Sequence, residues 1–254
     1  MAGARREGGP IGARSFGPVA AGYAVLRPTY PPDAVDFLLA GPDRRRTVLD
    51  LGAGTGLLTE VVTGAGHRVV AVDPSPEMLA QLSRRLPGVG TAVGTAEAVP
   101  LADAAVDAVV AGQAAHWFAP APAAREIRRV LRAGGNLGLI WNTRDERVPW
   151  VGALGALIAE VSHGHEAEQG VVADLAAELP ADVATTESRI VQRLTPEEVV
   201  AGIGTRSYVA VMDEARRRTF LAAVRELLAA HPGTRGRPVL ELPYVTCAYR
   251  LTPR

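Results

Sequence analysis

The feature that most constrains this chain of 254 residues is a glycine-rich turn between a strand-like run and a helical stretch. Thr47–Leu51 (TVLDL) predicts a short buried strand, and Leu57–Ala65 predicts a helix. Gly52, Gly54 and Gly56 lie between them. Glycines at these points allow a tight turn and let a ligand approach main-chain N–H groups. The turn therefore predicts a ligand site where a strand passes into a helix.

Strand-like and helical stretches alternate on both sides of this turn. Alternation of this kind predicts an α/β fold, in which a Rossmann-like, doubly wound, mostly parallel sheet has helices on both faces. Two later strands, Ser188–Arg193 and Leu240–Arg250, are expected at the far edge and make the sheet seven-stranded. The other expected strands are Thr47–Leu51, His67–Asp73, Gly90–Val93, Val106–Ala111 and Leu137–Trp141. The other expected helices are Ser75–Leu86, Ala121–Leu131, Trp150–Val161, Val171–Leu179, Thr195–Ala201 and Asp213–Ala230.

An acidic residue, Asp73, ends the second expected strand 21 residues after Gly52. A carboxylate at this place can accept hydrogen bonds from both hydroxyl groups of a ribose. A dinucleotide fingerprint needs a third Gly or Ala at position 57, where this chain has Leu57. The pattern therefore favours a nucleoside ligand, and an NAD(P)-dependent oxidoreductase is the less favoured alternative.

Several segments together resemble the class I S-adenosylmethionine-dependent methyltransferases. The segment 50–56 (DLGAGTG) resembles motif I of that family. Gly94–Leu101 resembles its adenine-side segment, Val106–Val110 its fourth strand, and Arg128–Gly135 its turn into the fifth strand. Three further segments, around Tyr23 and over 113–118 and 141–146, are similar to a small-molecule subgroup that includes the trans-aconitate type. The resemblance covers about residues 47–141.

The resemblance implies S-adenosyl-L-methionine as cofactor and a small molecule whose oxygen, nitrogen or carbon atom accepts the methyl group. The alternative within this resemblance is a regulatory protein that binds the cofactor without catalysis. The resemblance implies roles around the cofactor for thirteen residues of this sequence. The backbone of Gly52, Ala53 and Gly54 would line the methionine moiety, and Asp50 would order the loop or reach the ammonium through water. Asp73 would hold the ribose, and the adenine would be surrounded by Pro74, Met78, Thr95, Ala96 and Glu97. Gln113 would lie near the sulfonium or ammonium, and Tyr23 and Arg27 would close over the cofactor.

Methyl transfer depends mainly on aligning the acceptor, and a general base is needed only when the acceptor carries a proton. His116 is the first candidate base or positioning residue, and Asp145 and Glu146 are the weaker candidates. The alternative for the two acids is an ion pair with Arg144 or Arg147. The expected substrate-binding residues are Trp117, Trp141, Asn142 and Arg144.

Composition excludes several other chemistries. All 27 basic residues are arginine, so neither a Schiff-base lysine nor a Walker A lysine exists. With Cys247 as the single cysteine, a cysteine-based metal site is impossible, and His163 and His165 are interpreted as loop residues, so no metal is expected. The formal net charge of zero argues against nucleic-acid binding, and no apolar run predicts a membrane span.

The expected organisation is a single class I methyltransferase domain over 15–254 after a disordered tail over 1–14. Within the domain, 47–141 would form the cofactor-binding core and 150–230 would partly cover the substrate site. The N-terminus lacks the apolar stretch of a signal peptide, so a cytoplasmic protein is expected. The sequence does not indicate an oligomeric state.

Overall fold

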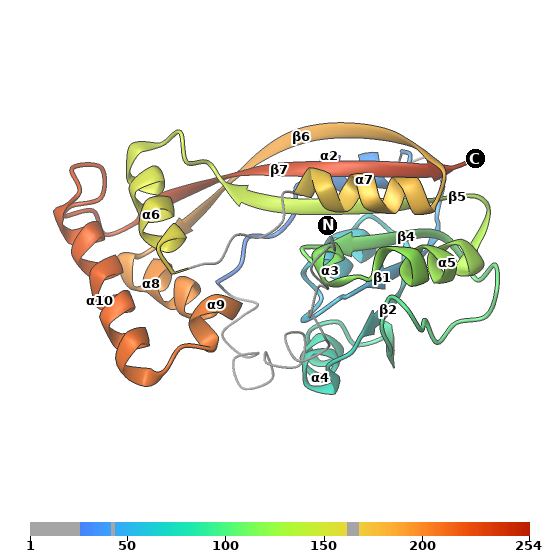
Figure 1. Ribbon diagram of the computed structural model, residues 1–254, viewed down its shortest axis with the longest axis horizontal. Coiled ribbons are helices and arrows are strands. Elements are labelled where there is room, and N and C mark those ends of the chain that lie inside the picture. Colours follow the sequence, from blue (N-terminus) through green and yellow to red (C-terminus); the bar gives the residue numbers. More distant parts are fainter. Residues whose placement is uncertain (1–25, 42–43, 162–167) are drawn as a thin grey trace, which may run out of the picture.

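The computed structural model describes residues 26–41, 44–161 and 168–254. Within these residues, seven strands form one sheet in the order β3-β2-β1-β4-β5-β7-β6 (Figure 1). The expected tail over 1–14 and the loop with His163 and His165 lie outside the described residues. The strands are β1 (Thr47–Leu51), β2 (Arg68–Asp73), β3 (Gly90–Val93), β4 (Val106–Gly112), β5 (Leu131–Arg144), β6 (Ala181–Leu194) and β7 (Leu240–Pro253).

The strand directions confirm the expected doubly wound, mostly parallel sheet. Strands β1 to β5 run parallel to one another, and β7 pairs antiparallel with both β5 and β6. The last two strands lie at the far edge, as expected. The helical elements are α2 (Pro32–Leu38), α3 (Leu57–Gly64), α4 (Pro76–Arg85), η2 (Ala115–Trp117), α5 (Pro120–Val130), α6 (Pro149–Ala159), α7 (Glu168–Glu178), α8 (Pro196–Gly204), α9 (Ser207–Ala210) and α10 (Glu214–Ala230).

Helices cover the sheet on both faces, which explains why its central strands read as continuous apolar runs. Successive side chains of a strand point to opposite faces. Val48 and Val110 accordingly pack in the core with α2 and α3, whereas Leu49 and Val109 pack in the core with α5 and α7. The binding turn after β1 is therefore held by a core on either side.

The helix starts follow the capping signals of the sequence. Ser75 caps α4 by accepting a hydrogen bond from the Met78 N–H at 3.2 Å. Thr195 and Glu198 form a reciprocal capping box at the start of α8, where Pro196 occupies the first turn. Such caps satisfy N–H groups that the helix itself leaves free. They set where the polypeptide enters each helix.

Two strands, β5 and β6, are much longer than expected, whereas β7 starts at the expected residue and ends at Pro253 instead of Arg250. β5 was expected over Leu137–Trp141 but covers Leu131–Arg144, and Gly134, expected in a helix-closing turn, lies inside this strand. The β4/β5 register passes from the pair Val106 and Leu131 directly to the pair Ala108 and Asn136, and Gly134 has φ of +75°, so the expected turn is present as an irregularity within the strand. The antiparallel β5/β7 ladder then runs to the pair Arg144 and Tyr244. Helices α2, α9 and η2 were not predicted.

The long ends of β5, β6 and β7 carry a helical lobe made of α6, α8, α9 and α10, on the left of Figure 1. The lobe has its own apolar core, with Trp150 and Leu154 of α6, Ile203 of α8 and Val224 of α10 packed on Tyr244 of β7. α7 instead packs on the main sheet, since Leu175 belongs to the core of α5. Of the helices after β5, α7 therefore packs on the main sheet, whereas α6, α8, α9 and α10 form the lobe.

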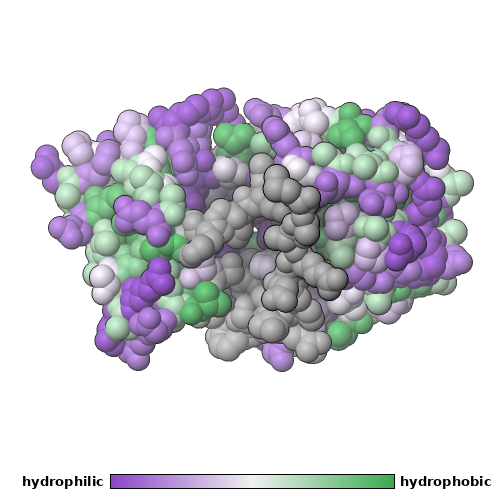
Figure 2. Space-filling view, in the orientation of Figure 1, coloured by the Kyte–Doolittle hydropathy of each residue, from purple (hydrophilic) through white to green (hydrophobic). Residues whose placement is uncertain are grey.

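The surface drawn in Figure 2 carries hydrophilic residues over both the lobe and the sheet half of the molecule. None of the helices in the described part of the chain is both long and apolar enough to cross a lipid bilayer.

Candidate functional site

A cavity of about 930 Å³ lies at the carboxyl ends of the parallel strands and extends to the helical lobe. Its volume is near the upper end of the range of small-molecule sites, which is about 300–1,000 Å³. Of the sequence-predicted site residues, Tyr23 lies outside the described residues. All the others line this cavity: Arg27, Asp50, Gly52, Ala53, Gly54, Asp73, Pro74, Met78, Thr95, Ala96, Glu97, Gln113, His116, Trp117, Trp141, Asn142, Arg144, Asp145 and Glu146.

The glycine-rich turn binds the end of β2. The N–H groups of Gly52 and Ala53 donate to the carbonyl oxygen of Val72 at 2.8 and 3.1 Å, and the Gly54 N–H donates to Asp73 Oδ2 at 2.8 Å. This corrects the expectation that these N–H groups approach a ligand, because all three are already bonded within the protein. Gly52 has φ of +75°, and a Cβ there would lie 2.6 Å from Ala114 Cβ. The turn therefore presents a compact floor to the cavity.

Asp73 links three parts of this floor. Besides Gly54, the Ser75 N–H donates to its Oδ1 at 2.9 Å, so each carboxylate oxygen accepts one backbone hydrogen bond. Each oxygen of an ionised carboxylate has a second acceptor position. Asp73 is only 8 % exposed, and this burial raises the pKa of its carboxyl above the usual value. Asp73 is held rigidly and retains acceptor capacity toward the cavity.

Asp50 is fully buried beneath the turn. Thr59 Oγ1 donates to Asp50 Oδ2 at 2.5 Å, whereas Asp50 Oδ1 has no hydrogen-bond partner. Burial, assisted by the nearby negative charge of Asp73, raises the pKa of Asp50 to about 7. A buried acceptor without a partner is costly unless a ligand or water satisfies it. Asp50 is therefore suited to meet a cationic or hydrogen-bonding group that enters the cavity.

The next wall comes from α4 and from the loop after β3. Met78 and Ala96 are both buried at 4 % exposure and offer an apolar surface to the cavity. Glu97 Oε1 accepts a hydrogen bond from the Ala119 N–H at 2.8 Å, which ties the loop to the start of α5. Thr95 and Ala98 form a short bridge that closes this loop on itself.

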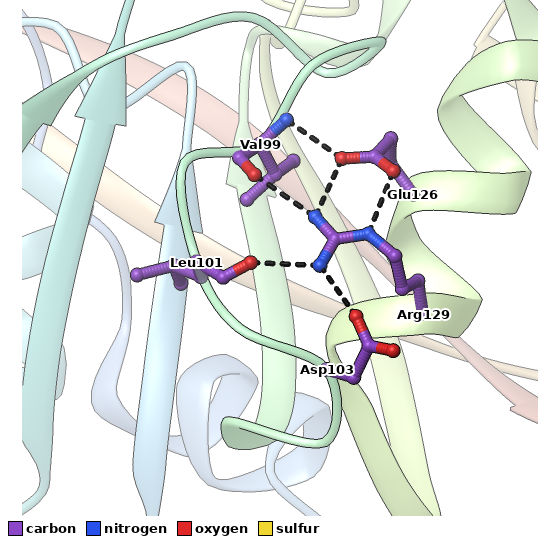
Figure 3. Close-up of polar contacts among 5 residues, drawn as sticks. All are labelled: Val99, Leu101, Asp103, Glu126 and Arg129. Atoms are coloured by element: carbon purple, nitrogen blue, oxygen red, sulfur yellow. Dashed lines mark hydrogen bonds and ion pairs between the residues drawn. The ribbon is translucent and has the colours of Figure 1, made fainter.

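A polar cluster on α5 anchors the same loop from behind (Figure 3). Arg129 donates to the carbonyl oxygens of Val99 at 2.9 Å and Leu101 at 2.7 Å. Its guanidinium also binds both carboxylate oxygens of Glu126, at 2.8 and 2.7 Å, and Glu126 accepts from the Val99 N–H. Glu126 has its pKa lowered to about 2, chiefly by the hydrogen bonds from Arg129. Neither residue lines the cavity, and sequence reasoning assigned neither a role in the site.

The residues after β4 and β5 bind one another. Gln113 has φ of +55°, and its side-chain N–H donates to the Asn142 carbonyl oxygen at 2.8 Å. The Asn142 amide donates to the Thr29 carbonyl oxygen at 2.9 Å and accepts from Thr246 Oγ1 at 2.5 Å. Both polar ends of Asn142 are therefore bonded within the protein. This favours a structural role for Asn142 over the substrate-binding role expected from sequence.

The three candidate bases differ in their surroundings. Asp145 binds Arg147 through two hydrogen bonds of 2.6 Å, which hold the pKa of its carboxyl below the usual value. This ion pair makes Asp145 a poor base, and an ion pair with Arg147 was the alternative expected from the sequence. Glu146 is exposed at the cavity edge. His116 lies in η2 with its ring 4.9 Å from that of Trp117, which is 46 % exposed.

Sequence reasoning missed Glu168, the first residue of α7. The Thr143 hydroxyl donates to Glu168 Oε1 at 2.8 Å, and burial raises the pKa of this carboxyl. Cys247 and Tyr249 of β7 line the same side of the cavity, where burial raises the pKa of Tyr249 to about 12. Nothing in the local sequence relates Glu168 to this wall, because α7 reaches it only by packing back on the sheet.

The lobe contributes further residues that were not predicted. Arg206 and Tyr208 line the cavity opposite the glycine-rich turn, together with Arg144. Arg27 donates to the Thr205 carbonyl oxygen at 3.3 Å and thus lies against the lobe. Within the described residues, no group of three or more His, Cys, Asp or Glu side chains is arranged to hold a metal ion.

The fold and this site define a class of proteins, the class I S-adenosylmethionine-dependent methyltransferases. Residues 49–139 match the family model described as a methyltransferase domain. An uncharacterized methyltransferase of Mycobacterium tuberculosis is 46% identical over 241 residues, which cover 94% of this chain and 95% of that protein. An uncharacterized methyltransferase of Schizosaccharomyces pombe is 42% identical over 154 residues, 59% of this chain and 61% of that protein.

A solved methyltransferase structure is also similar to this chain. The putative type II methyltransferase of Anaeromyxobacter dehalogenans superposes with a TM-score of 0.66 at 28% identity and covers 89% of this chain and 97% of that one. The chain belongs to the class I S-adenosylmethionine-dependent methyltransferase family.

Proposed function

We propose that this protein binds S-adenosyl-L-methionine and transfers its methyl group to a small molecule in the same cavity. The observation that carries the proposal is that one cavity joins two different surfaces. One is the rigid, acidic floor with Asp50 and Asp73, and the other is the wall of charged and aromatic side chains on β5, α7 and the lobe. A cavity of about 930 Å³ has room for a nucleoside cofactor and a small acceptor side by side.

The residues present fit this cofactor. The remaining acceptor positions of Asp73 suit the two hydroxyl groups of a ribose, and the unpartnered Oδ1 of buried Asp50 suits an ammonium group or a bridging water. Met78 and Ala96 offer the apolar surface that an adenine ring needs. When bound, S-adenosylmethionine supplies an electrophilic methyl group on its sulfonium.

The task left to the protein is to place the acceptor atom in line with the reactive methyl group, and alignment alone supplies much of the rate. Where the acceptor carries a proton, His116 and Glu168 are the groups that can remove it. Glu168 has the advantage that burial raises the pKa of its carboxyl toward neutrality, which is the direction a general base needs. Asp145 is unsuited because Arg147 keeps it ionised and paired.

Isothermal titration tests the cofactor half of the proposal. Purified protein should bind S-adenosylmethionine and S-adenosylhomocysteine but not NADH or NADPH. Binding of a nicotinamide cofactor with no binding of either sulfur nucleoside would refute the proposal and favour the oxidoreductase. Transfer of labelled methyl to a small-molecule fraction then tests the second half, with Glu168→Gln and His116→Asn compared. Cofactor binding without transfer to any acceptor would favour the regulatory alternative.

A further inference from the structure

Two arginines and a tyrosine line the cavity from β5 and the lobe, and the cofactor half of the site does not use them. Arg144 is the last residue of β5 and pairs with Tyr244 of β7. Arg206 follows the C-terminus of α8, and Tyr208 lies in α9. All three side chains border the cavity. We call this set the arginine wall.

Each side chain of the arginine wall has one polar atom that is buried without a partner. The Nε atoms of Arg144 and Arg206 and the hydroxyl of Tyr208 are inaccessible to solvent and have no hydrogen-bond partner. Across the described part of the chain, neither guanidinium forms an ion pair with a carboxylate. Arg147, three residues from Arg144, shows the contrast because it is exposed and pairs with Asp145 at 2.6 Å. The arginine wall therefore concentrates donors that the protein leaves unsatisfied.

The two guanidinium groups also repel each other. Burial and the positive charge of Arg206 lower the pKa of Arg144. Tyr208, Tyr244 and then Glu146 oppose this effect, but Glu146 is exposed and makes no ion pair with Arg144. Two partly buried like charges without a counter-ion are unfavourable, and an anion placed between them relieves both the repulsion and the missing hydrogen bonds.

We propose that Arg144, Arg206 and Tyr208 form a subsite for an oxyanion on the acceptor substrate, a carboxylate or a phosphate. This inference rests on the proposed function and adds the substrate class to it. Planar guanidinium groups donate paired hydrogen bonds to the oxygens of such a group, and the tyrosine hydroxyl supplies a further donor. The substrate would be anchored by its anion on the lobe, with its acceptor atom directed toward the glycine-rich turn.

The place of the arginine wall separates it from the cofactor half of the cavity. Asp50 and Asp73 come from β1 and β2, whereas Arg144 comes from the extension of β5, and β4 lies between β1 and β5 in the sheet. Arg206 and Tyr208 come from the lobe. Their loss should therefore weaken binding of the anionic acceptor and leave the nucleoside in place.

The test uses the full chain loaded with S-adenosylhomocysteine, and succinate and inorganic phosphate serve as probes. Titration calorimetry at constant ionic strength should show saturable binding of at least one of them, and the tighter probe identifies the oxyanion. Arg206→Gln and Arg144→Gln should weaken this binding about tenfold to 100-fold, since each removes charge-assisted hydrogen bonds. Tyr208→Phe should weaken it less and serves as the variant with the smallest structural change.

Arg218→Gln is the matched control, because Arg218 lies exposed on α10 and pairs with Glu214. It should bind both the nucleoside and the anion as the unchanged protein does. Nucleoside binding without saturable binding of either probe would overturn the inference and leave the proposed function intact. If Arg206→Gln and Tyr208→Phe lose S-adenosylhomocysteine instead of the anion, the wall serves the cofactor and the inference is wrong. Failure of the unchanged protein to bind the nucleoside would refute the proposed function itself.

Discussion

Replacing Arg129 with alanine should loosen the loop after β3, which carries Thr95, Ala96 and Glu97, although Arg129 itself does not line the cavity. Arg129 lies on α5 behind the loop and holds it through the carbonyl oxygens of Val99 and Leu101. It also orients Glu126, which accepts the Val99 N–H at 2.8 Å. Alanine is a better helix former than arginine, so α5 itself should not weaken. The loss should therefore appear in the loop.

The size of the effect follows from the contacts that are lost. The pair with Asp103 contributes little because Asp103 is 80% exposed. The two hydrogen bonds to carbonyl oxygens and the pair of hydrogen bonds to Glu126 are better shielded from solvent. The Arg129 side chain is 31% exposed and that of Glu126 is 20% exposed. Charge-assisted hydrogen bonds contribute about 1.5–3 kcal/mol when buried, and at this exposure the three contacts together should contribute about 2–4 kcal/mol.

The same pair adds a pH dependence whose sign is determined by Glu126. Its pKa is lowered from 4.5 to about 2 in the folded protein. The pair therefore contributes its full stabilisation above about pH 4.5, and that contribution is lost as the pH falls toward 2. A shift of this size corresponds to at most about 3.4 kcal/mol, and solvent screening reduces it. The Arg129→Ala variant should lose less stability between pH 5 and pH 3 than the unchanged protein.

Urea unfolding at pH 7, pH 5 and pH 3, with titration of S-adenosylhomocysteine at pH 7, measures both effects. We expect a loss of about 2–4 kcal/mol at pH 7 and about tenfold weaker nucleoside binding, because the ligand must then order the loop. Arg128→Ala is the control, since Arg128 lies on the same helix and donates to the Leu179 carbonyl oxygen at the end of α7 instead. Equal nucleoside affinities in the two variants would refute the role of Arg129 as the anchor of the loop.

Three shorter predictions concern the floor of the cavity. Asp73→Ala should weaken S-adenosylhomocysteine binding about 100-fold in calorimetry, because two acceptors for the ribose are lost, and unchanged affinity would contradict the ribose role. Gly52→Ala should lower the melting temperature and abolish nucleoside binding, since its Cβ would lie 2.6 Å from Ala114 Cβ at a φ of +75°. Asp50 has a pKa raised to about 7, so it favours the folded state only at low pH, and stability should fall as the pH rises from about 4 through 7. Asp50→Asn should remove this slope in urea unfolding at a series of pH values.

The parallel half of the fold was predictable because its signals are local. β1 occupies the expected residues Thr47–Leu51, and α3 and α4 begin where the glycine turn and the Ser75 cap indicate. The glycine spacing also located the floor of the cavity. It did not reveal that the N–H groups of Gly52, Ala53 and Gly54 bind the end of β2, because that pairing depends on the relative position of two strands.

The lengths of the last strands were not predictable from periodicity. β5 begins at Leu131, but Gly134 has φ of +75° and the β4/β5 register passes from Leu131 directly to Asn136, so the turn that the sequence indicated at Gly134 lies as an irregularity inside the strand. β6 reaches from Ala181 to Leu194 by pairing along the whole of β7. A short alternating run gives no indication of how far a partner strand will extend it.

The half of the cavity proposed for the cofactor and the half proposed for the acceptor differ in how the sequence specifies them, and this difference has a consequence for specificity. The cofactor half comes from residues 50–97, where short loops between adjacent parallel strands fix each position. The acceptor half combines Arg144 of β5, Glu168 of α7 and Arg206 beside α8, which meet only because β5, β6 and β7 extend together beyond the sheet. Substitutions in the lobe can therefore change which acceptor is held while the floor with Asp50 and Asp73 stays as it is. Nucleoside affinity and acceptor affinity should accordingly vary independently between variants of the two halves.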